Sequence, residues 1–157
     1  MPMADGPTAS AKPPKGRRGD YALLRAITTR WMDNDVYGHV NNVVFYSFFD
    51  TAVNATLIEA GLLDPTTSNV IGLVVETGCR YNASLAFPET VEAGVRVAKL
   101  GSSSVRYEIG LFKGGEEEAA AEGFFVHVFV DSETRRPTPL PEPLRAFLQT
   151  LLVEAPA

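Results

Sequence analysis

The sequence predicts an α+β domain in which one long helix lies against the concave face of a strongly curved antiparallel sheet of about five strands. Two observations predict this architecture. Helical periodicity occurs in one long stretch, residues 42–60, and four strand-like segments with only short breaks between them follow it. Strands and helices do not alternate, as they would in a parallel sheet built from βαβ units. One apolar helix is therefore expected to pack on one face of one sheet.

Length and composition are those of a single folded domain. The chain has 157 residues, of which 45% are hydrophobic and 21% are charged, and its formal net charge is −5. This acidic balance disfavours sequence-independent nucleic-acid binding, which uses a basic surface. No apolar run approaches the roughly 20 residues of a membrane-spanning helix, and the N-terminus lacks a signal-peptide segment. We therefore expect a cytoplasmic protein with a small-molecule partner.

Residues 1–20 are expected to form a disordered tail. Four prolines stand there among small residues, together with a short basic cluster formed by Lys12, Lys15, Arg17 and Arg18. Such a segment buries too little apolar surface to offset the entropy of ordering it. The folded domain is therefore expected to span residues 21–157.

The first elements of this domain are a strand and the long helix. Tyr21–Trp31 is rich in β-branched and aromatic residues and contains neither proline nor glycine, which favours a strand. Gly61 and Pro65 then end the helix that begins near Asn42. Its apolar residues recur at the spacing of one helix face, at Phe45, Phe48, Phe49, Ala52, Val53, Leu57 and Ala60.

Four strands are expected after the helix, over Val70–Phe87, Val91–Leu100, Ser103–Lys113 and Ala119–Asp131. Short turn signals such as Pro88-Glu89 and Gly114-Gly115 separate them, so consecutive strands are expected to pair as antiparallel hairpins. Apolar residues alternate from Val91 to Val97 and from Val105 to Leu111, which predicts one buried face for each of these strands. A short amphipathic helix is expected over Leu144–Val153.

Residues that can carry chemistry gather just before the long helix. They are Asp33, Asp35, Gly38, His39, Asn41 and Asn42. A carboxylate can activate water or attack a carbonyl, and free N–H groups at a helix N-terminus can polarise the carbonyl oxygen. The same stretch also fits a capping loop in which Asp or Asn accepts N–H groups and glycine supplies a positive φ. The spacing alone leaves both interpretations open, and one of the two acids is expected to be a cap or turn residue in either case.

Two other chemistries find little support. A metal site at Asp33, Asp35 and His39 would lack further ligands, because the other histidine, His127, lies in a strand pattern that favours a hydrogen-bonded structural residue. Serine nucleophiles of the G-x-S-x-G type are absent from the sequence. Cys79 is the only cysteine, so it forms no intrachain disulfide and is expected to be a half-buried strand residue. Neither a metal nor a cofactor is therefore expected.

The order Asp-x-Asp-x-x-Gly-His-Val-Asn-Asn at residues 33–42, entering a long helix and followed by strands, resembles the hotdog-fold acyl-CoA thioesterases of the 4-hydroxybenzoyl-CoA thioesterase type. It is also similar to the Asp-x-x-x-His-x-Asn-Asn signature of plant acyl-carrier-protein thioesterases. The resemblance covers about residues 21–152. It implies a hotdog fold, in which the sheet wraps a central helix, and a homodimer or homotetramer whose sheets pair edge to edge with each active site between two protomers.

The resemblance also implies roles for individual residues. Asp35 falls on the catalytic aspartate, Asn42 on the backbone N–H that polarises the thioester carbonyl, and His39 on the catalytic histidine of the plant enzymes. Tyr37 stands where the plant enzymes have a catalytic asparagine, so their mechanism does not transfer whole. The loop Val36-Tyr37-Gly38 also differs from the Pro-Ala-Gly of the benzoyl-CoA enzymes, so an aromatic substrate is not implied.

We therefore expect hydrolysis of an acyl-CoA thioester, with Asp35 as general base or nucleophile, Asn42 as oxyanion donor and His39 in an auxiliary role. Surface cations such as Arg80 or Arg106 are candidates for binding the phosphates of CoA. The expected substrate-binding residues are Tyr37, Gly38, Asn41, Arg80, Tyr81 and Ser84. The alternatives are a hydrolase acting on acyl-carrier protein, a hotdog dehydratase, and a protein that binds acyl-CoA without cleaving it.

Overall fold

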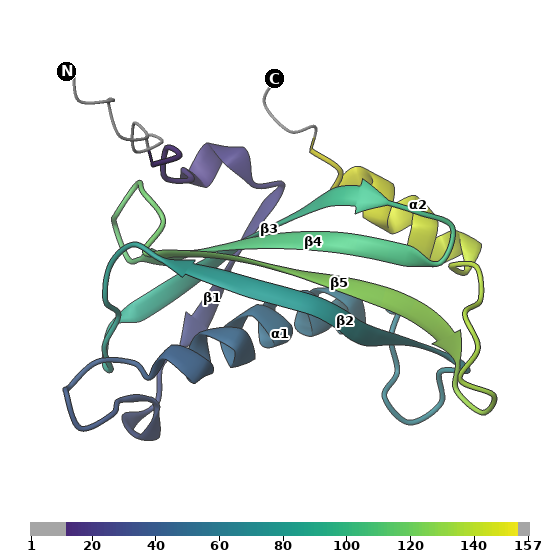
Figure 1. Cartoon of the computed structure of the whole chain (residues 1–157), viewed down its shortest axis with the longest axis horizontal. Helices are drawn as coiled ribbons and strands as arrows, with labels where there is room; N and C mark the ends of the chain where they lie inside the picture. The colour runs from purple at the N-terminus through teal and green to yellow at the C-terminus, as the bar shows by residue number, and fades with distance from the viewer. Residues whose placement is uncertain (1–11, 154–157) are drawn as a thin grey trace, which may run out of the picture.

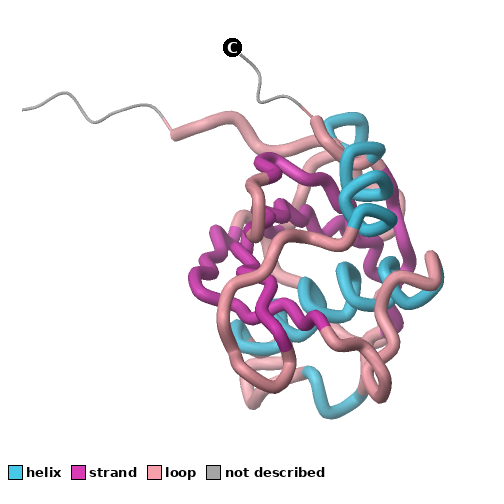
Figure 2. Tube along the Cα trace, turned by 90° about the vertical axis from the view of Figure 1, so that its right-hand side faces the viewer, coloured by secondary structure: helices cyan, strands magenta, loops and turns pink. Residues whose placement is uncertain are grey.

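A computed structural model describes residues 12–153 and confirms the α+β architecture (Figure 1). Five antiparallel strands form one sheet in the order β1-β3-β4-β5-β2. Their bounds are β1 Leu23–Thr28, β2 Val70–Tyr81, β3 Thr90–Leu100, β4 Ser104–Lys113 and β5 Ala121–Asp131. Helix α1, Asn42–Glu59, crosses the concave face, and helix α2, Glu142–Thr150, lies near its C-terminal end. The side view in Figure 2 shows the long helix within the curve of the sheet.

The predicted helix face is the one that packs on the sheet. Its buried apolar residues are Phe45, Phe48, Phe49, Ala52, Val53 and Leu57. Ala60 was expected on this face but caps the helix and is exposed. At Gly123 of β5 an added Cβ would come within 2.2 Å of the Phe49 ring. The missing side chain therefore lets the helix approach the sheet closely at this point.

The alternation predicted for β3 and β4 is confirmed. All eight apolar residues of the two series are buried: Val91, Ala93, Val95, Val97, Val105, Tyr107, Ile109 and Leu111. They point toward α1 and form the floor of the core, because alternate residues of a strand share one face.

The expected hairpin between the second and third strands is wrong. β2 pairs with β5, from Val70 opposite Asp131 to Tyr81 opposite Ala121, while β3 pairs with β1 and β4. The reason is that the chain leaves the sheet after Tyr81 and does not turn back beside β2. In this connection Leu85 is buried, and its carbonyl accepts the Val40 N–H. β2 is consequently an outer strand of the sheet, and it ends at Tyr81 rather than at residue 87.

The chain near residue 20 also differs from expectation, because residues 16–20 contact the sheet. Gly16 donates its N–H to Glu122 at 2.9 Å, and Arg18 forms an ion pair with Glu92 at 2.8 Å. Residues 18–20 form a short 3-10 helix. The expected tail at residues 1–11 lies outside the described residues. Neither α-helix of residues 12–153 is long and apolar enough to cross a lipid bilayer.

Candidate active site

The loop between β1 and α1 begins with a buried structural acid. Asp33 ends a 3-10 turn, Trp31–Asp33, and its side chain is 0% exposed. Its carboxylate accepts the Arg30 backbone N–H at 2.6 Å and the guanidinium Nε and Nη2 at 3.1 and 2.9 Å. Its own carbonyl accepts the Asn41 N–H at 2.9 Å. Asp33 therefore joins the end of the strand to the start of the helix and has no oxygen left for a substrate.

Asp35, the second acid, is half-buried in a tight turn. Its Oδ1 accepts the Tyr37 N–H at 2.9 Å, and its carbonyl accepts the Gly38 N–H at 3.1 Å. Gly38 has a φ of 81°, a conformation that side chains with a Cβ rarely adopt. Within residues 12–153 the Oδ2 atom of Asp35 accepts no hydrogen bond. The turn therefore holds the carboxylate in place through one oxygen and leaves the other available.

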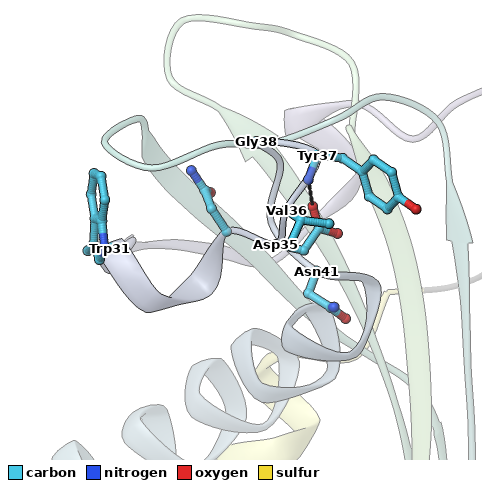
Figure 3. Close-up of a pocket in the computed structure, with 7 residues that line it drawn as sticks. Trp31, Asp35, Val36, Tyr37, Gly38 and Asn41 are labelled. Carbon is cyan, nitrogen blue, oxygen red and sulfur yellow. Dashed lines mark hydrogen bonds between the residues drawn. The ribbon is translucent and has the colours of Figure 1, made fainter.

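The Asp35 carboxylate lines an open hollow of about 730 Å³, which we call the Asp35 hollow. Its lining residues are Trp31, Asn34, Asp35, Val36, Tyr37, Gly38 and Asn41. Figure 3 shows the rings of Trp31 and Tyr37 at opposite ends of this group, with Asp35 and Asn41 between them. Trp31, Val36 and Tyr37 are 82%, 94% and 82% exposed, so apolar surface surrounds a carboxylate.

At the start of α1, the Asn42 N–H has no acceptor among residues 12–153. Asn41 is the N-cap, and its Oδ1 accepts the Val43 N–H at 3.1 Å while its carbonyl accepts the Val44 N–H at 2.9 Å. The N–H groups of Val40 and Asn41 are accepted by the carbonyls of Leu85 and Asp33. Among the N–H groups of residues 40–44, only that of Asn42 has no acceptor in the described part of the chain. A free N–H at the positive end of a helix dipole favours a negatively charged oxygen.

Asn42 lines a second hollow of about 300 Å³, which we call the Asn42 hollow. Its lining residues are His39, Val40, Asn42, Phe45, Tyr81, Asn82, Ala83 and Ser84. The motif is therefore divided between two hollows, with Asp35 in one and His39 and Asn42 in the other. The Asp35 N–H donates to the His39 carbonyl at 2.9 Å, so the backbone joins the two residues.

The structure brings most of the predicted site residues to these hollows, but not Arg80. Tyr37, Gly38 and Asn41 line the Asp35 hollow, while Tyr81 and Ser84 line the Asn42 hollow. Arg80 lies instead with Arg96 and Arg106 in a cavity on the outer face of the sheet. Arg80 and Tyr81 are adjacent in β2, and adjacent strand residues point to opposite faces.

Sequence reasoning missed Trp31, Asn34 and Val36 as lining residues. Asn34 also holds the loop to the chain after β2, because its Oδ1 accepts the Phe87 N–H at 3.0 Å. A signal was present, since Trp31 and Val36 are large apolar residues in a loop that no periodicity assigns to the core.

The expectation of a hydrogen-bonded His127 is wrong. Its Nε2 is buried without a partner among residues 12–153, and its ring stacks on Phe125 with the centroids 4.8 Å apart. Burial lowers the pKa of His127 to about 4, although the Asp50 carboxylate partly opposes this effect. Cys79 is half-buried as expected, and burial raises the pKa of its thiol. Within residues 12–153, no group of three or more His, Cys, Asp and Glu side chains is placed to hold a metal ion.

A family model described as the thioesterase-like superfamily matches residues 29–148. The chain belongs to this superfamily. The match includes the whole motif and both hollows, and it confirms the resemblance to the thioesterases and the hotdog fold. Membership supports thioester hydrolysis as the general activity. No curated protein matches the chain.

Solved structures of the same fold include two proteins from Pseudomonas aeruginosa. The PA5185 protein of strain PAO1 is 54% identical, with a TM-score of 0.87, and the alignment covers 88% of this chain and 97% of that one. The PA2801 protein, named as a candidate thioesterase, is 28% identical with a TM-score of 0.76, covering 82% and 98%. A 1,4-dihydroxy-2-naphthoyl-CoA thioesterase from Synechocystis shares the fold with a TM-score of 0.74 at 14% identity, covering 80% and 94%.

Proposed function

We propose that this protein hydrolyses an acyl-CoA thioester to the free acid and CoA. One observation carries the proposal: a single loop holds the Asp35 carboxylate and ends at the Asn42 N–H, and within the described residues one carboxylate oxygen and this N–H have no hydrogen-bond partner. These are the two groups that acyl transfer to water requires, namely a base or nucleophile and a donor for the oxygen that becomes negatively charged. Membership of the thioesterase-like superfamily supports the same reaction.

In the proposed reaction the thioester oxygen accepts the Asn42 N–H, and the helix dipole stabilises the charge that develops on it. Asp35 either takes a proton from the attacking water or attacks the carbonyl itself to form an anhydride that water then opens. In both routes the C–S bond breaks, the acyl group gains an oxygen from water, and the sulfur leaves with a proton as the thiol of CoA. His39 lines the Asn42 hollow and orients the water or the thioester.

The two hollows could hold the two parts of such a substrate, the acyl group and the CoA. Tyr37, Gly38 and Asn41 at the Asp35 hollow, and Tyr81 and Ser84 at the Asn42 hollow, are the proposed lining residues. The exposed apolar surface near Asp35 favours an apolar acyl group, because covering it removes that surface from water.

We further propose that the protein acts as a homodimer, or as a tetramer built from this dimer, in which the outer edges of two β2 strands pair. β2 is an outer strand of 12 residues, and Val74 and Val75 on it are 51% and 61% exposed. A long apolar strand edge is a template for pairing with a second chain. β2 ends at Tyr81 in the Asn42 hollow, so a partner on this edge would lie beside the proposed site.

A thiol-release assay on a panel of short, long and aromatic acyl-CoAs tests the proposed activity. We expect the protein to release thiol from at least one of them, and an acyl-carrier protein bearing the same acyl group measures the preference for the carrier. Faster thiol release from the acyl-carrier protein would show that the natural thioester is carried by that protein and not by CoA. Tight binding of acyl-CoA with no thiol release over hours would replace the enzyme by a binding protein. Assays with a hydroxyacyl and an enoyl thioester distinguish hydrolysis from dehydratase activity. Thiol release reports hydrolysis, and dehydration or hydration of the acyl group reports dehydratase activity.

A further inference from the structure

The last residue of β2 reaches across to the first turn of α1. The Tyr81 hydroxyl donates a hydrogen bond to the Asn42 carbonyl at 2.9 Å, and the Tyr81 ring packs edge-on against Phe45 with the centroids 5.0 Å apart. Partial burial, with a smaller contribution from the nearby Cys79 thiol, raises the pKa of Tyr81 to about 12. The hydroxyl therefore keeps its proton, and can donate it to the carbonyl, throughout the neutral range.

Backbone hydrogen bonds at the end of β2 fix the position of Tyr81. Tyr81 pairs with Ala121 of β5, and the next residue, Asn82, donates its N–H to the Ala120 carbonyl at 2.8 Å. The tyrosine thus projects from a strand that is fixed at its end. A hydrogen bond from it can hold the turn of another element in place.

The bond acts on the peptide unit that follows the free N–H of Asn42. The N–H of this unit, from Val43, is bound by the Asn41 Oδ1, and its carbonyl, from Asn42, is bound by Tyr81. The preceding peptide unit, which carries the Asn42 N–H, is held through the Asn41 carbonyl by the Val44 N–H. Both peptide units that flank the Cα of Asn42 are therefore fixed, while the Asn42 N–H itself has no acceptor in the described part of the chain.

We infer that Tyr81 is a positioning residue, whose hydroxyl fixes the direction of the Asn42 N–H through the first turn of α1 rather than donating a hydrogen bond to the substrate. Its catalytic consequence rests on the proposed function, since an oxyanion donor helps only when it is already aimed at the oxygen. Tyr81 has a single O–H, and it donates this hydrogen to the Asn42 carbonyl, so it cannot donate it to a substrate at the same time.

The test is Tyr81→Phe, which removes the hydroxyl and keeps the ring against Phe45. Thr77→Val is a matched control, because Thr77 also lies on β2 and its hydroxyl donates to a backbone carbonyl, that of Phe124, at the same 2.9 Å. Each variant loses one bond of the same kind from the same strand, but only Tyr81→Phe releases the turn of α1. Amide hydrogen exchange at Val43 and Val44 reports on that turn, and thiol release gives kcat and KM.

For Tyr81→Phe we expect exchange at Val43 and Val44 to be about three- to tenfold faster, as the loss of one hydrogen bond predicts. We expect kcat to fall about tenfold with KM unchanged, because a poorly positioned Asn42 N–H stabilises the transition state less. Thr77→Val should keep the parental values of all three.

Two results would overturn the inference. One is a raised KM at unchanged kcat, which would make Tyr81 a substrate contact. The other is unchanged exchange at Val43 and Val44, which would show that the hydroxyl does not hold the turn. A parental protein that releases no thiol from any thioester overturns the proposed function instead, and the exchange comparison then decides the anchoring of the turn by itself.

Discussion

Lowering the pH from 7 to 5 is expected to destabilise the fold through His127. This imidazole is buried in the core, and its Nε2 has no partner among residues 12–153. Burial lowers its pKa from the ordinary 6.5 to about 4. As the pH falls through 6.5 the unfolded chain takes up a proton on this residue, while the folded protein does so only near pH 4. The unfolded state is therefore favoured increasingly across this window, and stability rises with pH within it.

The size of the effect follows from the two pKa values. A difference of about 2.5 pH units corresponds to a maximum of about 3 kcal/mol in the free energy of unfolding. Almost all of this stability is present at pH 7, about 2 kcal/mol of it is lost by pH 5, and the loss levels off below pH 4.

Urea unfolding at pH 7 and pH 5 measures this loss, with His127→Phe as the comparison. The phenylalanine keeps an aromatic ring beside Phe125 and cannot titrate, so the variant should lose about 2 kcal/mol less than the parent between the two pH values. An NMR titration of the imidazole protons gives the pKa directly, since the chain has only two histidines. Equal losses in parent and variant, or titration of His127 near 6.5 in the folded protein, would refute this reasoning.

Three further predictions concern the loop, the core and the free strand edge. Asp33→Ala removes the acceptor of the Arg30 bonds from a buried site and should lower the free energy of unfolding by about 2–3 kcal/mol; an unchanged urea midpoint would contradict this. Gly123→Ala places a methyl group 2.2 Å from the Phe49 ring and should cost about 1–3 kcal/mol, so parental thermal stability would speak against the close helix–sheet contact. Val75→Lys places a charge on the exposed edge of β2 and should lower the mass in light scattering to that of a monomer, whereas a parental dimer mass in the variant would exclude this edge as the interface.

The local patterns of the sequence predicted the elements well, because helix and strand periodicity depend on neighbouring residues. The helix face from Phe45 to Leu57 and the alternation in β3 and β4 are examples. The pairing of β2 with β5 could not be predicted in this way, since it joins segments about 50 residues apart. Short turn signals give only the pairing of consecutive strands, and the segment after Tyr81 leaves the sheet without forming such a turn.

The candidate site shows the same limit. The motif contains the acids, the glycine and the amides that the structure uses, but the free N–H of Asn42 depends on where four neighbouring N–H groups find acceptors. All four acceptors lie outside α1, and one of them, the carbonyl of Leu85, belongs to the connection after β2, which the motif does not reveal. The placement of Arg80 was open to prediction, because residues 80 and 81 of one strand face opposite sides of the sheet.

The central claim is that the protein hydrolyses an acyl-CoA thioester with Asp35 as base or nucleophile. Its most direct test is the turnover of the Asp35→Asn variant on the acyl-CoA of the panel that the parent hydrolyses fastest. The amide retains the oxygen that accepts the Tyr37 N–H, so the turn is kept while the base or nucleophile is lost. Asp64→Asn serves as the control, since this exposed acid lies outside both hollows. We expect kcat to fall at least about a hundredfold in Asp35→Asn and to stay parental in the control. A folded Asp35→Asn protein that hydrolyses the thioester at the parental rate would contradict the account.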